Sequence, residues 1–440
     1  MSAPAPTEPA TSSPARRRSL AFHRNFRQLW IGDALGQFGA QLAMLALPIY
    51  AVSTLHATAW QMGALTAAET AAFLLIGLPA GAWVDRMRKR RTLIAADLVR
   101  AAVLAVVVVA GLTGHSSMAL LYAAALTMSA ATVFFDISHQ SYVPGLVGLE
   151  RVVEGNSKLQ ATQSVAAVIA PAVGGALLRV ITAPALLAGT VLTYLTSAAA
   201  VGRIRHEETL PARADRRPLR TEIAEGVRFV AHQPLLRRIV ACTSLGNFSG
   251  ATAGALTVIY ALRVLGLDAA TLGLVFSASS VGGIVGAVLA DRIARWIGEG
   301  RSVAYSAVFW APAAALTPLA LPLAHAGIPP ALTMITAGAM SSFLGVVYNV
   351  SQVSFRQRVC PPALLGRMNA SVRFIVWGTV PLGGLLGGFL GTHLGVVQTI
   401  WVGVAGLALA CLPVVLSPLV RMRDLPGRPD EAEDPPARQE

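Results

Sequence analysis

Twelve apolar stretches follow one another along the 440-residue chain, with short polar segments between them. Each is about 20 residues long, the length with which an α-helix crosses the hydrocarbon core of a bilayer. Hydrophobic residues make up 54% of the chain and charged residues only 13%, which excludes an ordinary soluble domain. The pattern predicts an all-α membrane protein with twelve transmembrane helices, near residues 29–53, 60–83, 92–112, 118–140, 160–180, 185–204, 239–262, 270–290, 302–322, 331–350, 369–391 and 397–419.

The second half of the chain repeats the first. LGQFGAQLAMLALPIYA (35–51) returns as LGNFSGATAGALTVIYA (245–261), and DISHQSYV (136–143) returns as NVSQVSFR (349–356). A third match places Asp85 of GAWVDR opposite Asp291 of the second copy. Three matches in one order at nearly one spacing indicate two copies of a membrane unit. We therefore expect two pseudosymmetric six-helix bundles, an arrangement found in many secondary transporters.

These patterns divide the chain into five parts. Residues 1–25 and 421–440 have the composition of disordered tails, and the two bundles should occupy residues 26–204 and 237–420. Residues 205–236 should form a cytoplasmic linker. Within it, Ile223, Val227 and Val230 have helical spacing, which predicts an amphipathic helix on the membrane surface.

The distribution of positive charge predicts the orientation. The formal net charge is +13, and most of the 35 lysine and arginine residues fall in tails and loops on one predicted side of the membrane. Positively charged loops stay in the cytoplasm, so both termini should be cytoplasmic in a bacterial inner membrane. The charge therefore needs no nucleic-acid partner. The three cysteines have neither metal-binding nor disulfide spacing, and we expect no metal and no cofactor.

The most specific local motif is GAWVDRMRKRR (81–91), between the second and third helices. It places Gly81 four residues before Asp85, followed by a basic run that includes Arg86 and Arg88. The carboxylate can face a helix N-terminus or an arginine of the other half, and the basic run can bind lipid phosphates. A basic loop alone would explain the arginines but not the spacing of glycine and aspartate.

With this motif the chain resembles the major facilitator superfamily. Three further segments, FRQLWIGDALGQFG, EGVRFVAHQPLLRR and LLGRMNASVRFIVWGTVPLGG, resemble its branch of enterobactin exporters and macrolide-efflux proteins, the transmembrane secretion effectors. The resemblance extends from about residue 22 to residue 421. It implies twelve helices in two bundles, alternating access and export across the inner membrane.

The resemblance also implies gating residues. Asp85 would latch the cytoplasmic side of the outward-open state against the eleventh helix, with Arg373 or Arg367 as its partner. IAPAVGG in the fifth helix is similar to the signature of proton-coupled drug exporters, with Ala170 in place of a glycine. The fourth helix lacks the arginine that many drug–proton antiporters carry. Prolines and glycines at matching positions predict bends used in transport, at Pro171, Gly174, Gly175 and Pro381.

Acidic residues inside membrane helices normally face a cavity or a partner, because an exposed charge there is costly. Glu69, in the second helix, is the deepest, and we predict that it couples protons or substrate to transport; a structural hydrogen bond is the alternative. Asp33 could share this role or pair with a cytoplasmic arginine. Asp136, at the predicted end of the fourth helix, is a candidate gate. Asp97 and Arg100 are three residues apart and should pair.

Neutral polar and aromatic residues are predicted to bind the substrate. They lie in the first, seventh and tenth helices, which line the cavity of the superfamily: Gln37, Gln41, Asn247, Tyr260, Tyr348 and Asn349. A wide apolar cavity with few polar groups suits a bulky amphipathic molecule. His139 and Trp377 are predicted to pack between helices.

The chain has no phosphate-binding loop, no zinc-protease motif and no nucleophile elbow, so we expect a transporter and not an enzyme. The favoured function is proton-coupled efflux of a small lipophilic or amphipathic molecule of the drug, macrolide or siderophore type. Its expected partners are the substrate, protons and membrane lipids, and a monomer is the default. The alternatives are a facilitator or importer of a metabolite, a lipid scramblase and a non-transporting sensor.

Overall fold

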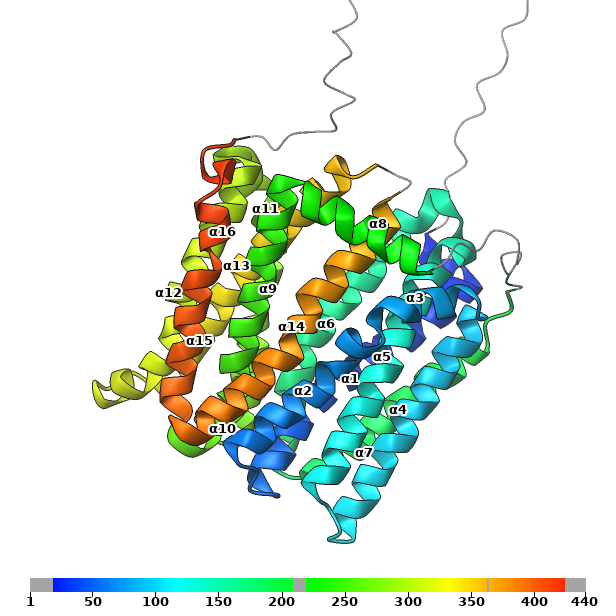
Figure 1. The fold of residues 1–440 in the computed structure, drawn as a ribbon. Helices are drawn as coiled ribbons and strands as arrows, with labels where there is room; N and C mark the ends of the chain where they lie inside the picture. The colour runs from blue at the N-terminus through cyan, green and yellow to red at the C-terminus, as the bar shows by residue number, and fades with distance from the viewer. Residues whose placement is uncertain (1–18, 207, 209–218, 362–363, 424–440) are drawn as a thin grey trace, which may run out of the picture.

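The computed structural model describes residues 19–206, 208, 219–361 and 364–423, and every long element in this part is a helix (Figure 1). The first half contains α1 (Arg24–Ser53), α2 (Ala59–Leu75), α3 (Gly77–Asp85), α4 (Lys89–Leu112), α5 (Met118–Val147), α6 (Val152–Leu177) and α7 (Ala183–Gly202). The second half contains α9 (Pro234–Gly254), α10 (Thr257–Ile259), η4 (Tyr260–Val264), α11 (Ala269–Ile297), α12 (Glu299–His325), α13 (Pro330–Val359), α14 (Leu365–His393), α15 (Val396–Ala410) and α16 (Leu412–Val415). Short helical turns, η1 (Leu20–Phe22), η2 (Leu149–Arg151) and η5 (Pro418–Val420), lie at one end of the bundle, which we call the termini side.

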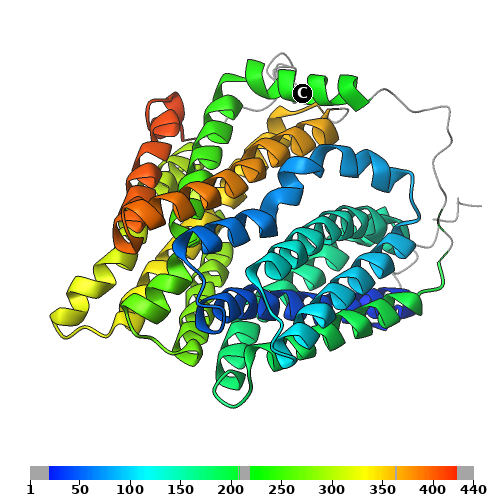
Figure 2. The ribbon, with the colours of Figure 1, turned by 60° about the horizontal axis from the view of Figure 1, so that its bottom comes forward.

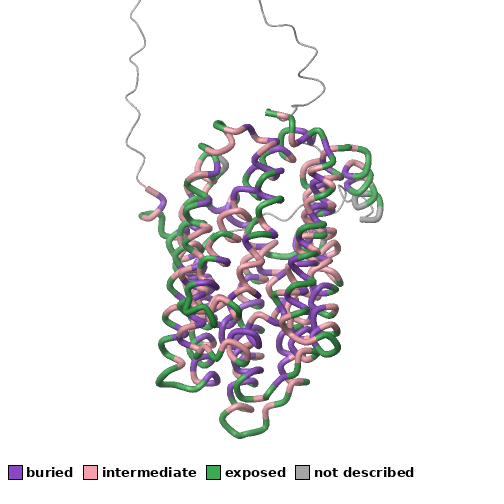
Figure 3. The backbone as a smooth tube through the Cα atoms, turned by 90° about the vertical axis from the view of Figure 1, so that its left-hand side faces the viewer, coloured by how far each residue is buried: buried purple, intermediate pink, exposed green. Residues whose placement is uncertain are grey.

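In the described part of the chain the helices make twelve membrane passes, as predicted. Ten helical segments of the described chain are long and apolar enough to span a bilayer. The other two passes are α6, whose first half is polar, and α2 with α3. Figure 3 shows exposed positions along the outside of the bundle. Large apolar side chains are among the exposed residues, for example Val106 and Val109 of α4. Such a surface suits a lipid solvent.

The second pass is broken, whereas the sequence predicts one continuous helix over residues 60–83. The break lies at Ile76, which has φ −128° and ψ −1°. Pro79 has no amide hydrogen to donate to the carbonyl of Leu75. Gly77 also destabilises a helix relative to alanine at the same position. The chain therefore turns after α2 and restarts as α3.

Several helices extend beyond the predicted spans on the termini side. The longest extensions belong to α13, which continues to Val359, and α6, which begins at Val152. The helix α5 also continues, to Val147. Asp136 consequently lies within α5 and not at its end.

The predicted amphipathic helix is present as α8 (Leu219–His232), between the two halves. It crosses the termini side and packs against α14 (Figures 1 and 2). Gly226 permits the close approach, because a Cβ there would lie 2.5 Å from the carbonyl oxygen of Arg367. Val230 is buried and Val227 is exposed. The helix thus buries one face on protein, and its contact with a membrane surface stays a prediction.

The two halves meet through two helix pairs, α2 with α14 and α6 with α11. Both contacts are closest near the helix ends that lie opposite the termini side. A Cβ on Gly63 would lie 2.5 Å from the carbonyl oxygen of Gly384, and one on Gly175 would lie 2.9 Å from the Cα of Gly273. Small residues allow such backbone contact, which stabilises helix association in lipid by packing.

Candidate functional site

A chamber lies between the two halves. One part, of about 810 Å³, is lined mainly by α1, α5 and α6, and a second, of about 780 Å³, reaches α11, α12 and α13. The two parts share Gln160, Gln163 and Ser164 of α6. A third part, of about 410 Å³, continues to Pro171 and Leu45 at the deep end. Both bundles therefore line one continuous space.

The chamber is closed at the end opposite the termini side. Arg263 of the second half donates hydrogen bonds to the carbonyl oxygens of Ala57 (2.8 Å) and Val52 (2.9 Å) in the first half. Arg179 and Asp268 form an ion pair across the same end, with 3.6 Å between nitrogen and oxygen. At the other end, the chamber extends to residues such as Asn156, in the first turns of α6 on the termini side. The structure thus represents a state with access from the termini side.

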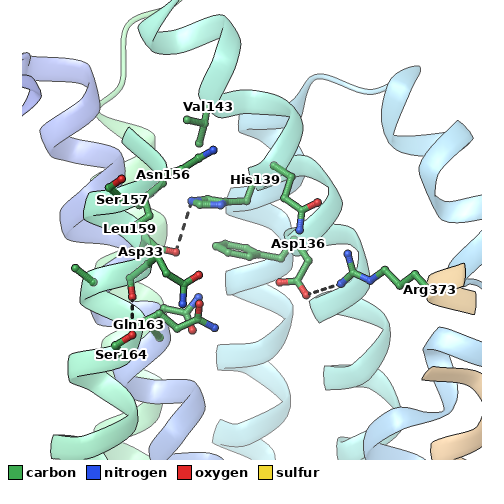
Figure 4. A pocket seen from close by; sticks show the side chains of 15 residues that line it. Asp33, Asp136, His139, Val143, Asn156, Ser157, Leu159, Gln163, Ser164 and Arg373 are labelled. Carbon is green, nitrogen blue, oxygen red and sulfur yellow. Dashed lines mark hydrogen bonds and ion pairs between the residues drawn. The ribbon is translucent and has the colours of Figure 1, made fainter. Parts of the chain in front are cut away.

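The wall of the first half carries ionisable groups (Figure 4). The Nε2 of His139 lies 3.5 Å from Oδ1 of Asp33, which is buried. The ring of His139 stacks on Phe135, with 5.8 Å between ring centroids. The sequence predicts a packing role for His139, but the structure places it in the chamber beside a carboxylate. Gln37 lines the same part, and Gln41 lines the two deeper parts. Their role in substrate binding stays a prediction.

One ion pair connects the two walls. Arg373 of α14 donates a hydrogen bond from Nη2 to Oδ2 of Asp136 in α5, at 3.3 Å (Figure 4). About a third of each side chain is exposed. Water in the chamber therefore screens this pair, which can exchange partners more readily than a buried one.

A second ion pair lies behind this wall. Asp97 and Arg100 of α4 are buried, and Nη1 of Arg100 lies 3.2 Å from Oδ1 of Asp97, which confirms the predicted pairing. Ser197 of α7 donates a hydrogen bond to the other carboxylate oxygen at 2.7 Å. The guanidinium of Arg100 lies over Phe135, 4.5 Å from the ring centroid. The pair thus joins α4, α5 and α7 directly behind the chamber.

Apart from Arg373, the wall of the second half is neutral in the described part of the chain. It is formed by small residues, aliphatic residues, Trp310 and Asn349. The Oδ1 of Asn349 accepts a hydrogen bond from Nε2 of Gln352 at 2.7 Å. By the sequence repeat, these two residues occupy the positions of Asp136 and His139.

The structure places three predicted substrate-binding residues outside the chamber. Tyr260 is fully buried and donates to the carbonyl oxygen of Pro318 at 3.2 Å. Tyr348 is buried and lies 2.8 Å, hydroxyl to hydroxyl, from Thr243. Asn247 donates to the carbonyl oxygen of Val376 at 3.0 Å. Their polar groups join helices of the second half, so in this conformation their role is structural.

Glu69 lines none of the four cavities described here. It is partly buried, on the same side of α2 as the buried residues Met62 and Leu65. Among the described residues, its carboxyl group has no hydrogen-bond or ion-pair partner. A coupling role for Glu69 stays a prediction.

The loop motif lies where α3 ends and α4 begins, on the termini side. Gly81 lines a side cavity of about 390 Å³ between α3, α5 and α14, while Arg86 and Arg88 are exposed. The side chain of Asp85 lies outside the described part of the structure. Arg367, one of its two predicted partners, forms an ion pair with Glu225 of α8. The latch therefore stays a prediction.

The proline and glycine clusters take part in helix packing. A Cβ on Gly174 would lie 2.8 Å from Cδ2 of Leu42 in α1. Gly175 and Pro171 contact α11, and Pro381 is buried in α14, which continues through it. Their predicted use as bending sites is not visible in a single conformation.

Sequence reasoning missed the polar face of α6. Asn156, Gln160, Gln163 and Ser164 all line the chamber, and their spacing of three and four residues places them on one helical face. The sequence contains this spacing, but the prediction for this helix was based on its prolines and glycines. Among the described residues, no cluster of His, Cys, Asp and Glu is placed to hold a metal ion.

The sequence matches the family model of transmembrane secretion effectors over residues 19–437. The enterobactin exporter EntS of Citrobacter koseri is 25% identical over 426 residues, which cover 94% of this chain and 97% of that protein. The multidrug efflux pump Tap of Mycolicibacterium fortuitum is 25% identical over 409 residues, which cover 89% and 95%.

Solved structures share the fold at low identity. A point mutant of the nucleoside transporter NupG superimposes with a TM-score of 0.73 at 13% identity, covering 89% of this chain and 99% of NupG. A bacterial homologue of the iron transporter ferroportin in an inward-facing state gives 0.70 at 15% identity over 90% of this chain and 98% of that one. An outward-facing structure of such a homologue gives only 0.58 at 16% identity over 89% and 99%. The chain is therefore a membrane transporter that belongs to the transmembrane secretion effector family of the major facilitator superfamily.

Proposed function

We propose that the protein exports a small amphipathic molecule from the cytoplasm by alternating access. The observation that carries this proposal is the chamber between the halves, which reaches the termini side and is closed at the other end. Most lysine and arginine residues lie toward the termini side, which supports its assignment to the cytoplasm of a bacterial inner membrane. The two relatives named as an exporter and an efflux pump support the outward direction.

The chamber fits a drug-sized ligand. Its two larger parts, about 810 and 780 Å³, are within the usual range of about 300 to 1,000 Å³ for small-molecule sites. Glutamines and carboxylates line one side, while Val346, Ile284 and Trp310 contribute apolar surface to the other. This division supports a substrate with distinct polar and apolar parts.

We also propose that proton binding drives the cycle through Asp33, Asp136 and Glu69. A protonated carboxyl group resides in a membrane interior at lower cost than a carboxylate, so protonation biases two conformations of similar energy. For export in exchange for protons, the proton must enter while the chamber is open away from the termini side and leave to the termini side, so it resets the transporter. Its loss would leave Asp136 charged and able to pair with Arg373 in the state described here. Substrate binding would then free that arginine as the termini side closes. Asp85 would then latch the closed side, with Arg373 or Arg367 as its partner.

Transport into inside-out membrane vesicles tests the proposal. Vesicles that contain the protein should accumulate at least one member of a panel of dyes, macrolides and siderophores against its gradient, and a protonophore should abolish the accumulation. Equilibration that is insensitive to the protonophore would indicate a facilitator instead. If crosslinking the two halves at the termini side left activity intact, alternating access would be refuted in favour of a scramblase or sensor.

A further inference from the structure

The side cavity between α3, α5 and α14 meets the main chamber at Gln140 and Arg373, which line both. The rest of its wall is mostly apolar. Its apolar members are Phe73, Leu78, Val133, Ile137, Ala370 and Phe374, and its further polar members are Ser141 and Asn369. The cavity, of about 390 Å³, thus has a polar end beside the chamber and an apolar remainder.

This cavity lies at a lateral seam between the two halves. The break at Ile76 separates α3 from α2, and a Cβ on Gly81 would meet no atom within 4 Å. Large apolar side chains are exposed on the same helices: Leu75 is 65% exposed, Trp83 42% and Trp377 45%. These three residues line none of the four cavities. Exposed apolar residues outside the cavities of a membrane bundle face lipid, and tryptophans favour the level of the head groups. The seam is therefore within reach of the lipid leaflet on the termini side.

Arg373 determines the charge at the polar end. It is the only arginine or lysine among the described residues that line the four cavities, and the side cavity has no acidic residue in its described lining. Its guanidinium lies 5.4 Å from the centroid of the Phe73 ring and, among the described residues, makes one hydrogen bond, to Asp136. A guanidinium has five N–H donors, so several can still bind a ligand, and its planar fork matches phosphate.

We propose that the side cavity is a lateral binding site for a single-chain amphiphile with a phosphate or similar anionic head group. The head group binds Arg373, with Asn369 and Gln140 beside it, and the alkyl chain lies along Phe73 and Phe374 toward the lipid. Basic sites between membrane helices on the cytoplasmic side suit such head groups. The inference rests on the proposed export function and deepens it, because it gives the substrate class and its route into the chamber.

Photocrosslinking tests the site. The full chain is reconstituted in lipid nanodiscs with dodecyl phosphate that carries a diazirine near the end of its chain, or with the matching dodecyl trimethylammonium probe. Mass spectrometry should locate the phosphate probe on α3, α5 and α14 around the cavity, with at least fivefold less labelling by the ammonium probe. Excess inorganic phosphate should not displace the probe if the ligand arrives from lipid.

Two variants and a control define the site. Arg373→Gln and Gly81→Phe, which remove the cation and fill the cavity, should each reduce labelling at least fivefold. Gly189→Phe should not, because Gly189 of α7 has open space at its Cβ and lines none of the cavities described here. Equal labelling by both probes, insensitivity to Gly81→Phe, or full displacement by inorganic phosphate would overturn the lateral site.

The vesicle assay separates this site from the export function. Export by the wild type without labelling of the cavity would refute the lateral site and leave the transporter proposal standing. Labelling of the cavity without transport of any panel member, the phosphate probe included, would refute export and retain the binding site.

Discussion

The two walls of the chamber come from the same repeated unit but differ in charge. The first half places two carboxylates and a histidine at the chamber, Asp33, Asp136 and His139. The repeat places uncharged residues at the corresponding positions of the second half, Thr243, Asn349 and Gln352. Both sets make local polar contacts, His139 with Asp33 in one half and Gln352 with Asn349 in the other.

This difference in charge separates two properties that identical halves would share, namely conformational movement and ion coupling. Both halves can move alike, because matched pairs of interface helices join them. Among the described residues that line the chamber, only those of the first wall include carboxylates and a histidine, so we infer that ion coupling depends on the first half. The described lining from the second half supplies neutral surface and one cation, Arg373, which reaches across to Asp136. The predictions below probe this asymmetry in order of decreasing effect.

The largest effect on stability should come from the buried ion pair behind the first wall. Asp97→Ala would leave Arg100 without its carboxylate in a site where it is 4% exposed. Breaking a buried pair from one side costs about 3 to 5 kcal/mol, so the free energy of unfolding in detergent should fall by that amount. In the second half, Asp291→Ala breaks an exposed pair with Arg295 and should change it by less than about 1 kcal/mol. Equal losses in both variants would contradict the asymmetry.

The next effect concerns transport. Asp136→Asn gives the first wall the residue that the second wall has at this position, and it leaves Arg373 without its anionic partner. Efflux should therefore fall about tenfold, which corresponds to a rise of about 1.4 kcal/mol in the activation free energy. Asn349→Ala in the other wall should lower efflux by less than about threefold. A double variant with Arg373→Gln should lose less than the two single effects combined, because the two residues interact. Strict additivity would show that the ion pair has no part in transport.

His139→Gln introduces the residue of the second wall. The variant replaces an imidazole whose Nε2 lies 3.5 Å from Oδ1 of Asp33 with a neutral amide. Because this contact joins α1 and α5 at the chamber, efflux should fall about fivefold, or about 1 kcal/mol. Gln352→Ala is the matched control in the second wall and should lower efflux by less than about twofold. Equal losses in the two variants would exclude the contact between His139 and Asp33 from transport.

The smallest effect should appear at the closed end. Hydrogen bonds from Thr271 hold the pKa of Asp268 below its ordinary value, so its contribution to stability is present above that ordinary pKa and is lost as the pH falls below it. Asp268→Ala removes the N-cap of α11 and should lower stability by about 1 kcal/mol near neutral pH. Asp268→Asn retains a cap and should lose less. Thermal unfolding at neutral pH distinguishes the two, and a full loss in Asp268→Asn would assign the effect to the pair with Arg179.

Most of the fold was predictable because it depends on local sequence. Apolar length fixed the twelve passes, the repeat showed the two bundles, and helical spacing identified α8 and the Asp97–Arg100 pair. The pairing of Asp136 with Arg373 was not predictable, because these residues are far apart in sequence and meet only through the relative rotation of the halves. Tyr260 is a similar case, since its sequence position does not show that its hydroxyl turns toward α12.

The most direct test is how the distances across the two ends of the chamber respond to pH. Electron–electron double resonance measures these distances in a variant without the native cysteines. Spin labels at Val153 and Trp296 report on the termini side, and labels at Val180 and Leu274 report on the closed end; all four positions are exposed. Between pH 8 and pH 6, the wild type should redistribute between two distances, with opposite changes at the two ends. The triple variant Asp33→Thr, Asp136→Asn and His139→Gln, in which the first wall has the chemistry of the second, should show the same distances at both pH values. A triple variant that redistributes as the wild type does would contradict the assignment of ion coupling to the first half.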